Sequence, residues 1–470
     1  MNFMDQPVTI KTKLSILATG FLSFIGILIE TSMNVTFPTL MKEFQVTLST
    51  VQWVTTGYLL LVTIVMSTTS YLVKRFDARK IFLTAATMCL LGTIICAAAS
   101  TFSILMLGRL LEAIATGLST PTLFHIILSR IPTNKLGIYT GFATMVTSFA
   151  PALGPTYGGI INNYMSWRMI FIGVLPIIVI VMLTGGLTIS LQARHDNPKF
   201  DFLGLAILAG LMVTLIISID QGGKQGFTSN NFIVGIIITI ILMLFFMYHL
   251  KYGKRQLLNF QILRYPIVSL RAINFFILQF MNIGISFVIP ILAEETLKTN
   301  SMVAGLILLP GSILGAIISP IAGSVYDRKG SFLPLFISNI SMLFGAILFT
   351  LLTHKITITL IMIFYCFMRG GFNFGYGNTM SDASKLVAIN EKPDVNSLFN
   401  TLQQYAGSLG TGIMSAVVSA QQLNLAHNSS MIAKTAAKGC QLDFLILIIL
   451  AIIALSTTLI GKHILDDKVR

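Results

Sequence analysis

The stretch LSFIGILIETSMNVTFP, residues 22–38, is an apolar run that carries one carboxylate, Glu30. Runs of this kind, each near the ~20 residues that a helix needs to cross a bilayer, recur along all 470 residues. The chain is 54% hydrophobic and only 10% charged, whereas a soluble domain carries roughly 25% charged residues. This composition excludes a soluble globular protein and indicates an integral membrane protein.

The cysteines and histidines show no pattern of metal ligands or of a disulfide framework. The four cysteines are scattered without CxxC spacing, and the six histidines show no HExxH or other paired spacing. We therefore expect free thiols, no metal and no organic cofactor. Lys11 and Lys13 precede an apolar run that is too long for a signal peptide, so we expect the first helix to act as an uncleaved insertion signal.

Fourteen apolar segments stand between breaks made by charged residues, Pro or Gly. They cover residues 14–36, 50–73, 80–100, 102–125, 136–161, 168–190, 202–220, 231–250, 267–292, 302–325, 333–353, 356–378, 397–420 and 441–461. We expect an all-α membrane protein with fourteen transmembrane helices. The even number places both termini on the same side, and the connections are too short to hold a soluble domain.

The basic residues are distributed unevenly between the two sides of this topology. The N-terminus, the even-numbered connections and the C-terminus hold 22 of the 31 Lys and Arg residues, while the opposite connections hold seven. The positive-inside rule therefore predicts that both termini are cytoplasmic. The same asymmetry explains the net charge of +14 without a nucleic-acid partner.

Weak internal similarity indicates a duplication. GRLLEAIATG at 108–117 places Arg109 eight residues before a Gly, as MRGGFNFGYG at 368–377 does with Arg369. The connections SYLVKRFDARK at 70–80 and GSVYDRKG at 323–330 also correspond. Such repeats are common in transporters. We predict an N-terminal six-helix bundle (1–190), an inserted helix pair with its linkers (191–266) and a C-terminal six-helix bundle (267–470).

Glu30 and Glu112 are predicted to be embedded in the membrane, whereas the other acidic residues lie in connections or near predicted helix ends. A charge at membrane depth costs at least ~2.5–3.5 kcal/mol on insertion scales, so such residues usually face a cavity or a partner. Loss of hydration favours the protonated form of a carboxyl group. A carboxylate without a fixed cation also attracts a cationic substrate, and this competition is the physical basis of proton/cation antiport.

Each of these carboxylates also has a purely structural interpretation. Glu30 has no Lys or Arg within two turns, but Asn34, one turn away, is a possible hydrogen-bond partner. Arg109 lies three residues before Glu112 on the same helix face, so the two can form a silent salt bridge. In the functional interpretation, Arg109 switches Glu112 and releases its proton when the pair forms. The predicted proton-coupling residues are Glu30, Glu112 and Arg109.

Polar and aromatic side chains inside the predicted helices indicate an amphipathic cavity for a small-molecule substrate. Met and Phe, with 22 and 33 copies, are plentiful enough to make such a cavity adaptable. Ordinary core packing is the alternative for most of the apolar side chains. The residues expected to line the cavity are Glu30, Asn34, Tyr58, Gln279, Asn282, Arg369, Asn373, Tyr376 and Gln403.

Four stretches resemble the fourteen-helix drug:proton antiporters of the major facilitator superfamily. IETSMNVTFP at 29–38 is similar to the LDxTIVNVALP of that branch, with Glu30 where Asp is usual, and TVQWVTTGYLL at 50–60 resembles the start of its second helix. GRLLEAIATG resembles motif B, whose arginine is here Arg109. ALGPTYGGIINNYMSWRMIF at 152–171 resembles motif C, the antiporter motif, followed by its usual Ser-Trp-Arg.

The resemblance assigns further residues to the transport machinery. The antiporter motif is represented by Gly154, Pro155, Gly158 and Gly159. The connections after the second and tenth helices resemble cytoplasmic gating loops and hold Arg75, Arg79, Asp327 and Arg328. In the first of these loops Lys74 replaces the usual Asp, and in motif B Glu112 stands where Gln is frequent.

The resemblance implies efflux of amphipathic, often cationic drugs, driven by proton entry through alternating access, with protons as the coupling ion. The expected partners are a small-molecule substrate and membrane lipid, the expected state is a monomer, and the expected location is a bacterial plasma membrane. An exporter of one lipid, metabolite or antibiotic class is the main alternative. A membrane-embedded enzyme would need a nucleophile–base pair or metal cluster, and a sensor would normally carry a soluble output domain; the sequence shows neither pattern.

Overall fold

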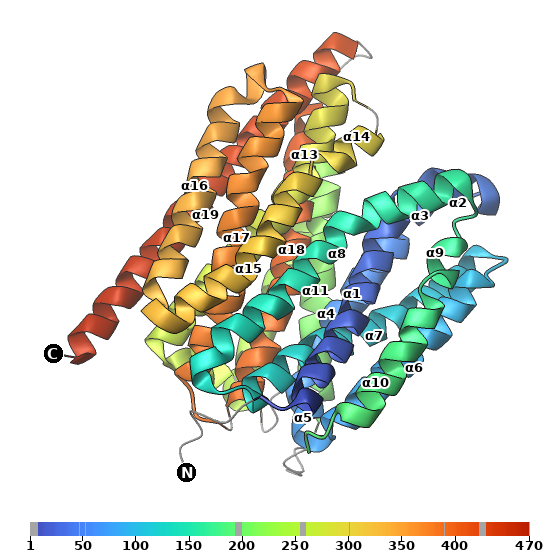
Figure 1. The fold of residues 1–470 in the computed structure, drawn as a ribbon. Coiled ribbons are helices and arrows are strands. Elements are labelled where there is room, and N and C mark those ends of the chain that lie inside the picture. The colour runs from blue at the N-terminus through green and yellow to red at the C-terminus, as the bar shows by residue number, and fades with distance from the viewer. Residues whose placement is uncertain are drawn as a thin grey trace. The chain divides into compact units, whose positions relative to one another are not determined.

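A computed structural model of the chain describes residues 8–46, 48–51, 53–192, 200–253, 260–299, 301–389, 391–422 and 429–469. Within these residues all regular structure is helical (Figure 1). The chain divides into two compact units, which are described separately. Unit 1 comprises Met1–Lys199 and Val387–Thr401, and unit 2 comprises Phe200–Leu386 and Leu402–Arg470.

Ten α-helices and one 3₁₀ helix of unit 1 precede residue 199. They are α1 (Ile10–Asn34), α2 (Phe37–Phe44), α3 (Leu48–Val51), α4 (Trp53–Ser67), α5 (Thr69–Arg75), α6 (Ala78–Ala97), α7 (Phe102–Arg130), η1 (Thr133–Lys135), α8 (Leu136–Tyr164), α9 (Met169–Ile172) and α10 (Leu175–Thr188). The first residues of α18 (Lys392–Gln422) also belong to unit 1, and the rest of that helix belongs to unit 2.

The remaining helices belong to unit 2. They are α11 (Phe202–Gln225), α12 (Asn230–Tyr252), η2 (Phe260–Arg264), α13 (Pro266–Leu297), α14 (Ser301–Leu306), α15 (Leu309–Lys329), α16 (Phe332–Leu352), η3 (Thr353–Lys355), α17 (Ile358–Lys385) and α19 (Ser429–Val469). Compactness therefore groups α11 and α12 with unit 2, while the predicted division at residues 190 and 266 stays a prediction.

Twelve helices of the described residues are long and apolar enough to cross a membrane. They coincide with twelve of the fourteen predicted spans. The other two predicted spans, 50–73 and 397–420, are also largely helical where they are described, but within the described residues neither forms a helix that combines the length and the hydropathy of a membrane span. The all-helical, multi-pass architecture is thus confirmed, whereas the count of fourteen and the two six-helix bundles stay predictions.

Two of the predicted spans contain an internal break, and one begins at the wrong residue. The spans predicted at 168–190 and 302–325 each comprise two helices, because Pro176 and Pro310 stand at the first turns of α10 and α15, where Pro favours a helix start. The span predicted at 441–461 starts twelve residues too late, since α19 begins at Ser429. Residues 429–440 are less apolar than a membrane span, but their Ala and Lys residues favour helix.

Small residues bring the helices of unit 1 close together. α6 packs along α7, and α1 packs along both α7 and α8. A Cβ atom added at Gly92 of α6 would lie 2.7 Å from the carbonyl oxygen of Gly108 in α7, so the two backbones are nearly in contact. Such close approach is typical of helix packing in membranes, where van der Waals contact replaces the hydrophobic effect.

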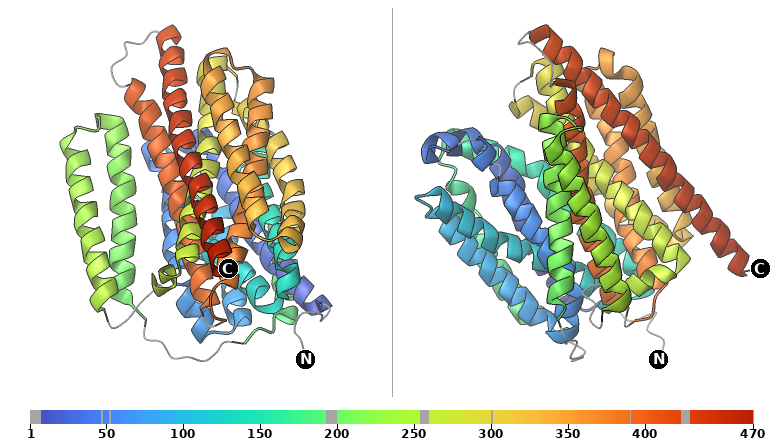
Figure 2. Two further views of the ribbon diagram at one scale, coloured as in Figure 1. Left: turned by 90° about the vertical axis from the view of Figure 1, so that its left-hand side faces the viewer. Right: turned by 180° about the vertical axis from the view of Figure 1, so that it is seen from behind.

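Unit 2 combines a helix bundle with a helical hairpin. α16, α17 and α19 pack against one another, and α13 packs against α17 and α19. α11 and α12 form an antiparallel pair that Figure 2 shows as a hairpin of two long helices. At its end the Nε2 atom of His249 lies 2.7 Å from Asp201 Oδ2, and Asp201 also caps α11 by accepting from the backbone N–H of Gly204.

Candidate functional site

Glu30 lies about one turn before the end of α1. Its side chain is partly buried, and within the described part of the chain it makes no hydrogen bond or ion pair. Among the described residues, Arg109 in α7 is the basic residue whose charge acts on the Glu30 carboxyl group. The side chain of Asn34 lies outside the described residues, so the alternative pairing of Glu30 with Asn34 stays open.

The ion pair that the spacing of Arg109 and Glu112 permits is present in α7. Arg109 Nη1 lies 2.8 Å from Glu112 Oε2, and both side chains are almost completely buried, with exposed fractions of 0% and 2%. Thr93 of α6 donates a hydrogen bond of 2.9 Å to the other carboxylate oxygen of Glu112. Among the described residues, Nε and Nη2 of Arg109 have no hydrogen-bond acceptor, so the guanidinium is only partly satisfied.

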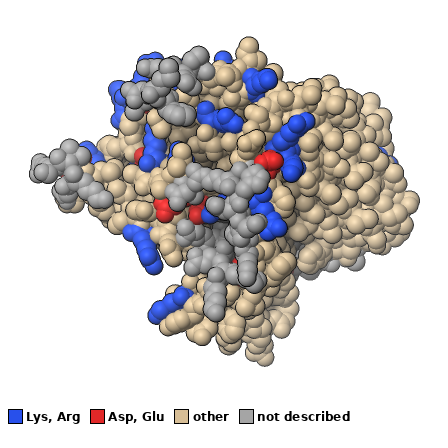
Figure 3. All heavy atoms as spheres, turned by 90° about the horizontal axis from the view of Figure 1, so that it is seen from below, with Lys and Arg blue, Asp and Glu red and all other residues tan. Residues whose placement is uncertain are grey.

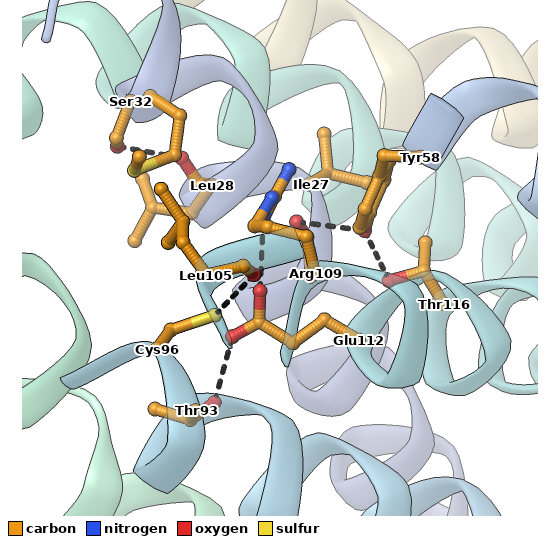
Figure 4. A network of polar contacts seen from close by, with 12 residues as sticks. Ile27, Leu28, Ser32, Tyr58, Thr93, Cys96, Leu105, Arg109, Glu112 and Thr116 are labelled. Atoms are coloured by element: carbon orange, nitrogen blue, oxygen red, sulfur yellow. Dashed lines mark hydrogen bonds and ion pairs between the residues drawn. The ribbon is translucent and has the colours of Figure 1, made fainter. Parts of the chain in front are cut away.

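Tyr58 of α4 joins α1 and α7 beside this pair. Its ring centroid lies 4.2 Å from Arg109 Cζ, which is a cation–π contact. The Tyr58 hydroxyl donates to the carbonyl oxygen of Gly26 in α1 at 3.2 Å and lies 2.6 Å from Thr116 Oγ1 in α7. Figure 4 shows the Arg109 guanidinium between the Tyr58 ring and the Glu112 carboxylate. We name Glu30, Tyr58, Arg109 and Glu112 the unit-1 charge cluster.

The charges of this cluster do not balance. Glu30 and Glu112 are two carboxylates, and in the part of the chain that the structure describes Arg109 is the guanidinium whose charge acts on both. Because an uncompensated charge is costly at membrane depth, the excess negative charge is best neutralised by a proton or by a cation. The arrangement can therefore bind either one, which is the chemistry that exchange requires.

The antiporter-motif glycines bring α8 against α1 close to Glu30. A Cβ atom at Gly158 would lie 2.5 Å from the carbonyl oxygen of Ser32, and one at Gly154 would lie 1.8 Å from Thr31 Oγ1. The Ser32 hydroxyl donates to the Gly154 carbonyl oxygen at 2.9 Å. Pro155 lies within α8 beside Gly154, whereas the space around Gly159 is open. Two of the four motif residues therefore position the end of α1.

Six of the predicted cavity residues gather in unit 2, and we name Gln279, Asn282, Arg369, Asn373, Tyr376 and Gln403 the unit-2 polar cluster. Arg369 of α17 donates to Asn282 Oδ1 of α13. Asn373 accepts from Ser319 of α15 at 2.7 Å, and the Tyr376 hydroxyl donates to Gln403 Oε1 of α18 at 2.6 Å. The Gln279 amide is buried, and its Nε2 atom has no acceptor among the described residues.

The predicted gating residues lie at helix ends. Arg75 ends α5 and donates to the Tyr71 hydroxyl at 3.0 Å, and Arg79 lies exposed in the first turn of α6. Asp327 and Arg328 lie in the last turn of α15, where Arg328 is exposed. The structure thus brings none of these four side chains into the unit-1 charge cluster or the unit-2 polar cluster.

Two ion pairs near these loops were not predicted. Lys74 Nζ lies 2.5 Å from Asp394 Oδ1 in the first turn of α18, and Asp394 is almost completely buried. In unit 2, Arg271 of α13 lies 2.7 Å from Asp382 of α17. Arg271 is one of the 22 basic residues counted in the connections and termini, and this count is wrong for Arg271 because the residue is buried inside α13. The replacement of an expected Asp by Lys74 was the one signal that an acidic partner should exist elsewhere.

The Ser-Trp-Arg that follows the antiporter motif forms a clasp with α2. The Nε1 atom of Trp167 donates to Glu43 at 2.6 Å, and Arg168 forms an ion pair with Glu43 at 2.7 Å. Burial alone would raise the pKa of the Glu43 carboxyl, but the hydrogen bonds from Trp167 and Arg168 and the charge of Arg168 outweigh it and lower that pKa. The clasp ties α2 to the connection between α8 and α9.

The prediction that Glu30 and Glu112 are the embedded acidic residues is incomplete. Asp443 of α19 is also completely buried, inside the membrane span Lys434–Asp466. Its predicted position at a helix end was wrong because α19 begins much earlier in the chain.

Comparisons with known proteins agree with this architecture. The sequence model of the Major Facilitator Superfamily matches residues 19–411. The lincomycin resistance protein LmrB of Listeria monocytogenes is 30% identical over 402 residues, which cover 85% of this chain and 85% of the relative. The multidrug resistance protein B homolog of Mycobacterium tuberculosis is 23% identical over 412 residues, which cover 87% of this chain and 75% of the relative.

The fold is also similar to solved structures. The crystal structure of the human organic anion transporter MFSD10 (TETRAN) matches 94% of this chain and 100% of its own, with a TM-score of 0.63 at 13% identity. That identity supports a common fold alone. The family match and the bacterial resistance relatives identify a multi-pass membrane transporter rather than an enzyme, and the common fold agrees with this. The chain belongs to the Major Facilitator Superfamily.

Proposed function

We propose that this chain exports amphipathic, often cationic compounds across a bacterial plasma membrane in exchange for protons, by alternating access. The observation that carries the proposal is the charge imbalance of the unit-1 charge cluster, in which two carboxylates face one guanidinium. A proton and a cationic substrate would compete for the excess negative charge. The relatives that are named for lincomycin and multidrug resistance support the choice of drugs as substrates.

In this proposal Glu30 is the exchanging carboxylate and Arg109 sets its affinity. The ion pair with Arg109 already compensates Glu112, whereas Glu30 has no such contact among the described residues. Protonation of Glu30 would release a bound cation, and deprotonation would allow the next one to bind. Tyr58 would hold the guanidinium against α7 while Glu30 changes its charge.

The unit-2 polar cluster is proposed to bind the polar groups of the substrate. It supplies amides, a hydroxyl and a guanidinium from α13, α17 and α18, next to aromatic rings that stack on Tyr376. A few directional polar groups among apolar side chains are typical of small-molecule sites. Different subsets of these groups would serve chemically different substrates.

We further propose that both termini lie in the cytoplasm. The count of Lys and Arg in the connections supports this orientation. The face drawn in Figure 3 carries many basic and few acidic side chains, as expected of a cytoplasmic face. The fourteen-span topology of the resemblance would also place the termini on one side.

The proposal is tested with inverted membrane vesicles whose lumen is acidified. Uptake of ethidium, a lipophilic cation, is followed for the wild type, Glu30→Gln and Glu112→Gln, at matched expression. A tenfold proton gradient supplies ~1.4 kcal/mol per proton, so gradient-driven accumulation is measurable. Asp466→Asn, an exposed carboxylate near the end of α19, is the matched control.

We expect accumulation by the wild type and by Asp466→Asn, and none by Glu30→Gln. Normal accumulation by Glu30→Gln would contradict its role in coupling and would transfer that role to Glu112. If the wild type accumulates no ethidium, a panel of neutral and anionic compounds decides whether it is a narrow-substrate exporter. If the vesicles accumulate compounds of only one chemical class, that second function is favoured.

A further inference from the structure

Asp443 lies on the buried face of α19 in unit 2. Buried residues recur along this helix at intervals of three or four, at Ala436, Cys440, Asp443, Leu447, Ala451, Ala454 and Thr458. This face packs against α13 and α16. The carboxyl group therefore stands within the helix–helix contact and not toward lipid or water.

The carboxyl group of Asp443 is unsatisfied. Neither of its oxygen atoms has a hydrogen-bond partner among the described residues. The neighbouring contacts on α16 involve other residues: Gln441 donates to the carbonyl oxygen of Thr350 at 3.2 Å, and Phe444 stacks on Phe349 at 4.8 Å. The Gln441 amide and the Phe444 ring next to Asp443 therefore contact α16, whereas the Asp443 carboxyl group makes no hydrogen bond to the described residues.

Further along the same face of α19, Ala454 and Thr458 are hydrogen-bonded to α13 and α16. The carbonyl oxygen of Ala454 accepts from Asn274 of α13 at 2.9 Å and from Asn339 of α16 at 3.0 Å. Asn339 also donates to Thr458 at 2.8 Å. Near Ala454 and Thr458, α19 is therefore held by several hydrogen bonds to α13 and α16, whereas near Asp443 the described contacts are the Gln441 hydrogen bond and apolar packing, and the Asp443 carboxyl group adds no hydrogen bond.

No described charged group acts on Asp443. On α13, Arg271 lies against Gly461, which is 18 residues further along α19 and so about 27 Å away. α16 and residues 412–422 of α18 carry no titratable residue, and Lys355 of η3 is exposed. On α19, Lys438 is exposed and Cys440 is buried. The side chains of Glu294, Glu295 and His354 lie outside the described residues.

We propose that Asp443 is a second proton-binding site of this transporter, occupied by a proton in the present conformation. An ionised carboxylate without a donor or cation is far too costly at such a position, whereas a neutral carboxyl group is tolerated. The proton can leave only when water reaches Asp443, which requires α19 to separate from α13 and α16 at this end. The protonation of Asp443 would then be coupled to the packing of this end of α19 against α13 and α16.

The proposal rests on the proposed proton exchange for its role in transport, but its first test needs no substrate. Infrared spectra of the purified full-length protein at neutral pH report the carbonyl stretch of protonated carboxyl groups. We expect Asp443→Asn to lose part of this band, whereas Cys440→Ser, one turn away on the same face, keeps it. An unchanged band in Asp443→Asn would mean that Asp443 is ionised, which overturns the proposal.

The second test measures protons exchanged per ethidium ion in proteoliposomes. We expect the ratio to fall by one proton in Asp443→Asn, and to be kept in Asp443→Glu, which still titrates. A ratio equal to that of the wild type in Asp443→Asn would make this residue a permanently neutral packing group and would overturn the proposal. If the wild type itself exchanges no protons, the proposed function fails, and this is distinct from a failure of the Asp443 variants alone.

Discussion

Lys74 Nζ at the end of α5 lies 2.5 Å from Asp394 Oδ1 in the first turn of α18. The fourteen-helix antiporters that this chain resembles carry Asp at the position of Lys74, so the charge is reversed here and an acid on α18 compensates it. Further contacts hold the same segment: Asn396 donates to the Pro121 carbonyl oxygen at 2.7 Å. Asp394 also suits the positive end of the α18 dipole.

We predict that Lys74→Asp reduces transport and stability, because it places a second carboxylate beside the buried Asp394. The loss should be on the order of tenfold in transport rate, which corresponds to ~1.4 kcal/mol. Combination with Asp394→Lys should restore part of the activity, since the pair is regained but a cation then faces the helix N-terminus. Ethidium uptake and thermal unfolding of the purified variants measure both effects.

The matched control for this swap is Lys80→Asp. Lys80 is largely exposed and lies 3.9 Å from Asp77, so its ion pair is a surface contact of small value. This variant should behave like the wild type. An equal loss in Lys80→Asp and Lys74→Asp would show that net charge, and not the contact with Asp394, is responsible.

Glu112→Gln should destabilise the protein strongly, because it leaves the buried Arg109 guanidinium without its carboxylate. Breaking one side of a buried ion pair costs about 3–5 kcal/mol, whereas removal of both charges is often nearly neutral. The double variant Arg109→Gln/Glu112→Gln should therefore unfold at a higher temperature than Glu112→Gln. If the double variant still accumulates ethidium, the pair is a silent salt bridge; if it does not, the pair belongs to the coupling machinery.

Gly158→Ala should impair transport, whereas Gly159→Ala should not. The added methyl group at Gly158 meets the Ser32 backbone at 2.5 Å, which a side-chain rotation cannot relieve, while the space at Gly159 is open. Overpacking of this kind costs roughly 1–3 kcal/mol. Thermal midpoints and uptake rates of the two variants decide the point, and equal behaviour would mean that α1 and α8 do not pack as described.

The Glu43 clasp should make stability depend on pH in the acidic range. Because the folded pKa of Glu43 lies below its ordinary value of 4.5, its contribution is complete above that value and is lost as the pH falls through the folded pKa. Glu43→Gln should therefore unfold at a lower temperature than the wild type at pH 7, and this difference should shrink on acidification. A difference that stays constant with pH would contradict the clasp.

Hydropathy was sufficient to locate the twelve membrane-spanning helices of the described residues but not to define their ends. The span 102–125 was recognised because apolar residues dominate it, and α7 covers it as Phe102–Arg130. The start of α19 was missed since residues 429–440 form helix through Ala and Lys rather than through apolar character. Because a helix boundary at residue 441 places Asp443 near water, this error prevented its recognition as an embedded acidic residue.

The spacing of residues along the chain was sufficient to predict one ion pair, but not the contacts between residues that are far apart in the sequence. Arg109 and Glu112 are three residues apart on one helix, so their contact could be predicted from the chain alone. Lys74 and Asp394 are 320 residues apart, and Tyr58 and Thr116 lie on different helices. Such contacts depend on how the helices pack, which neither periodicity nor composition determines.

The most direct test of the central claim compares two modes of ethidium transport by Glu30→Gln in the same inverted vesicles. One mode is accumulation driven by an acidic lumen, and the other is exchange of labelled for unlabelled ethidium without any gradient. We predict that the variant loses gradient-driven accumulation, because its cluster can no longer gain and lose a proton at residue 30. Accumulation by Glu30→Gln at the rate of the wild type would contradict the account.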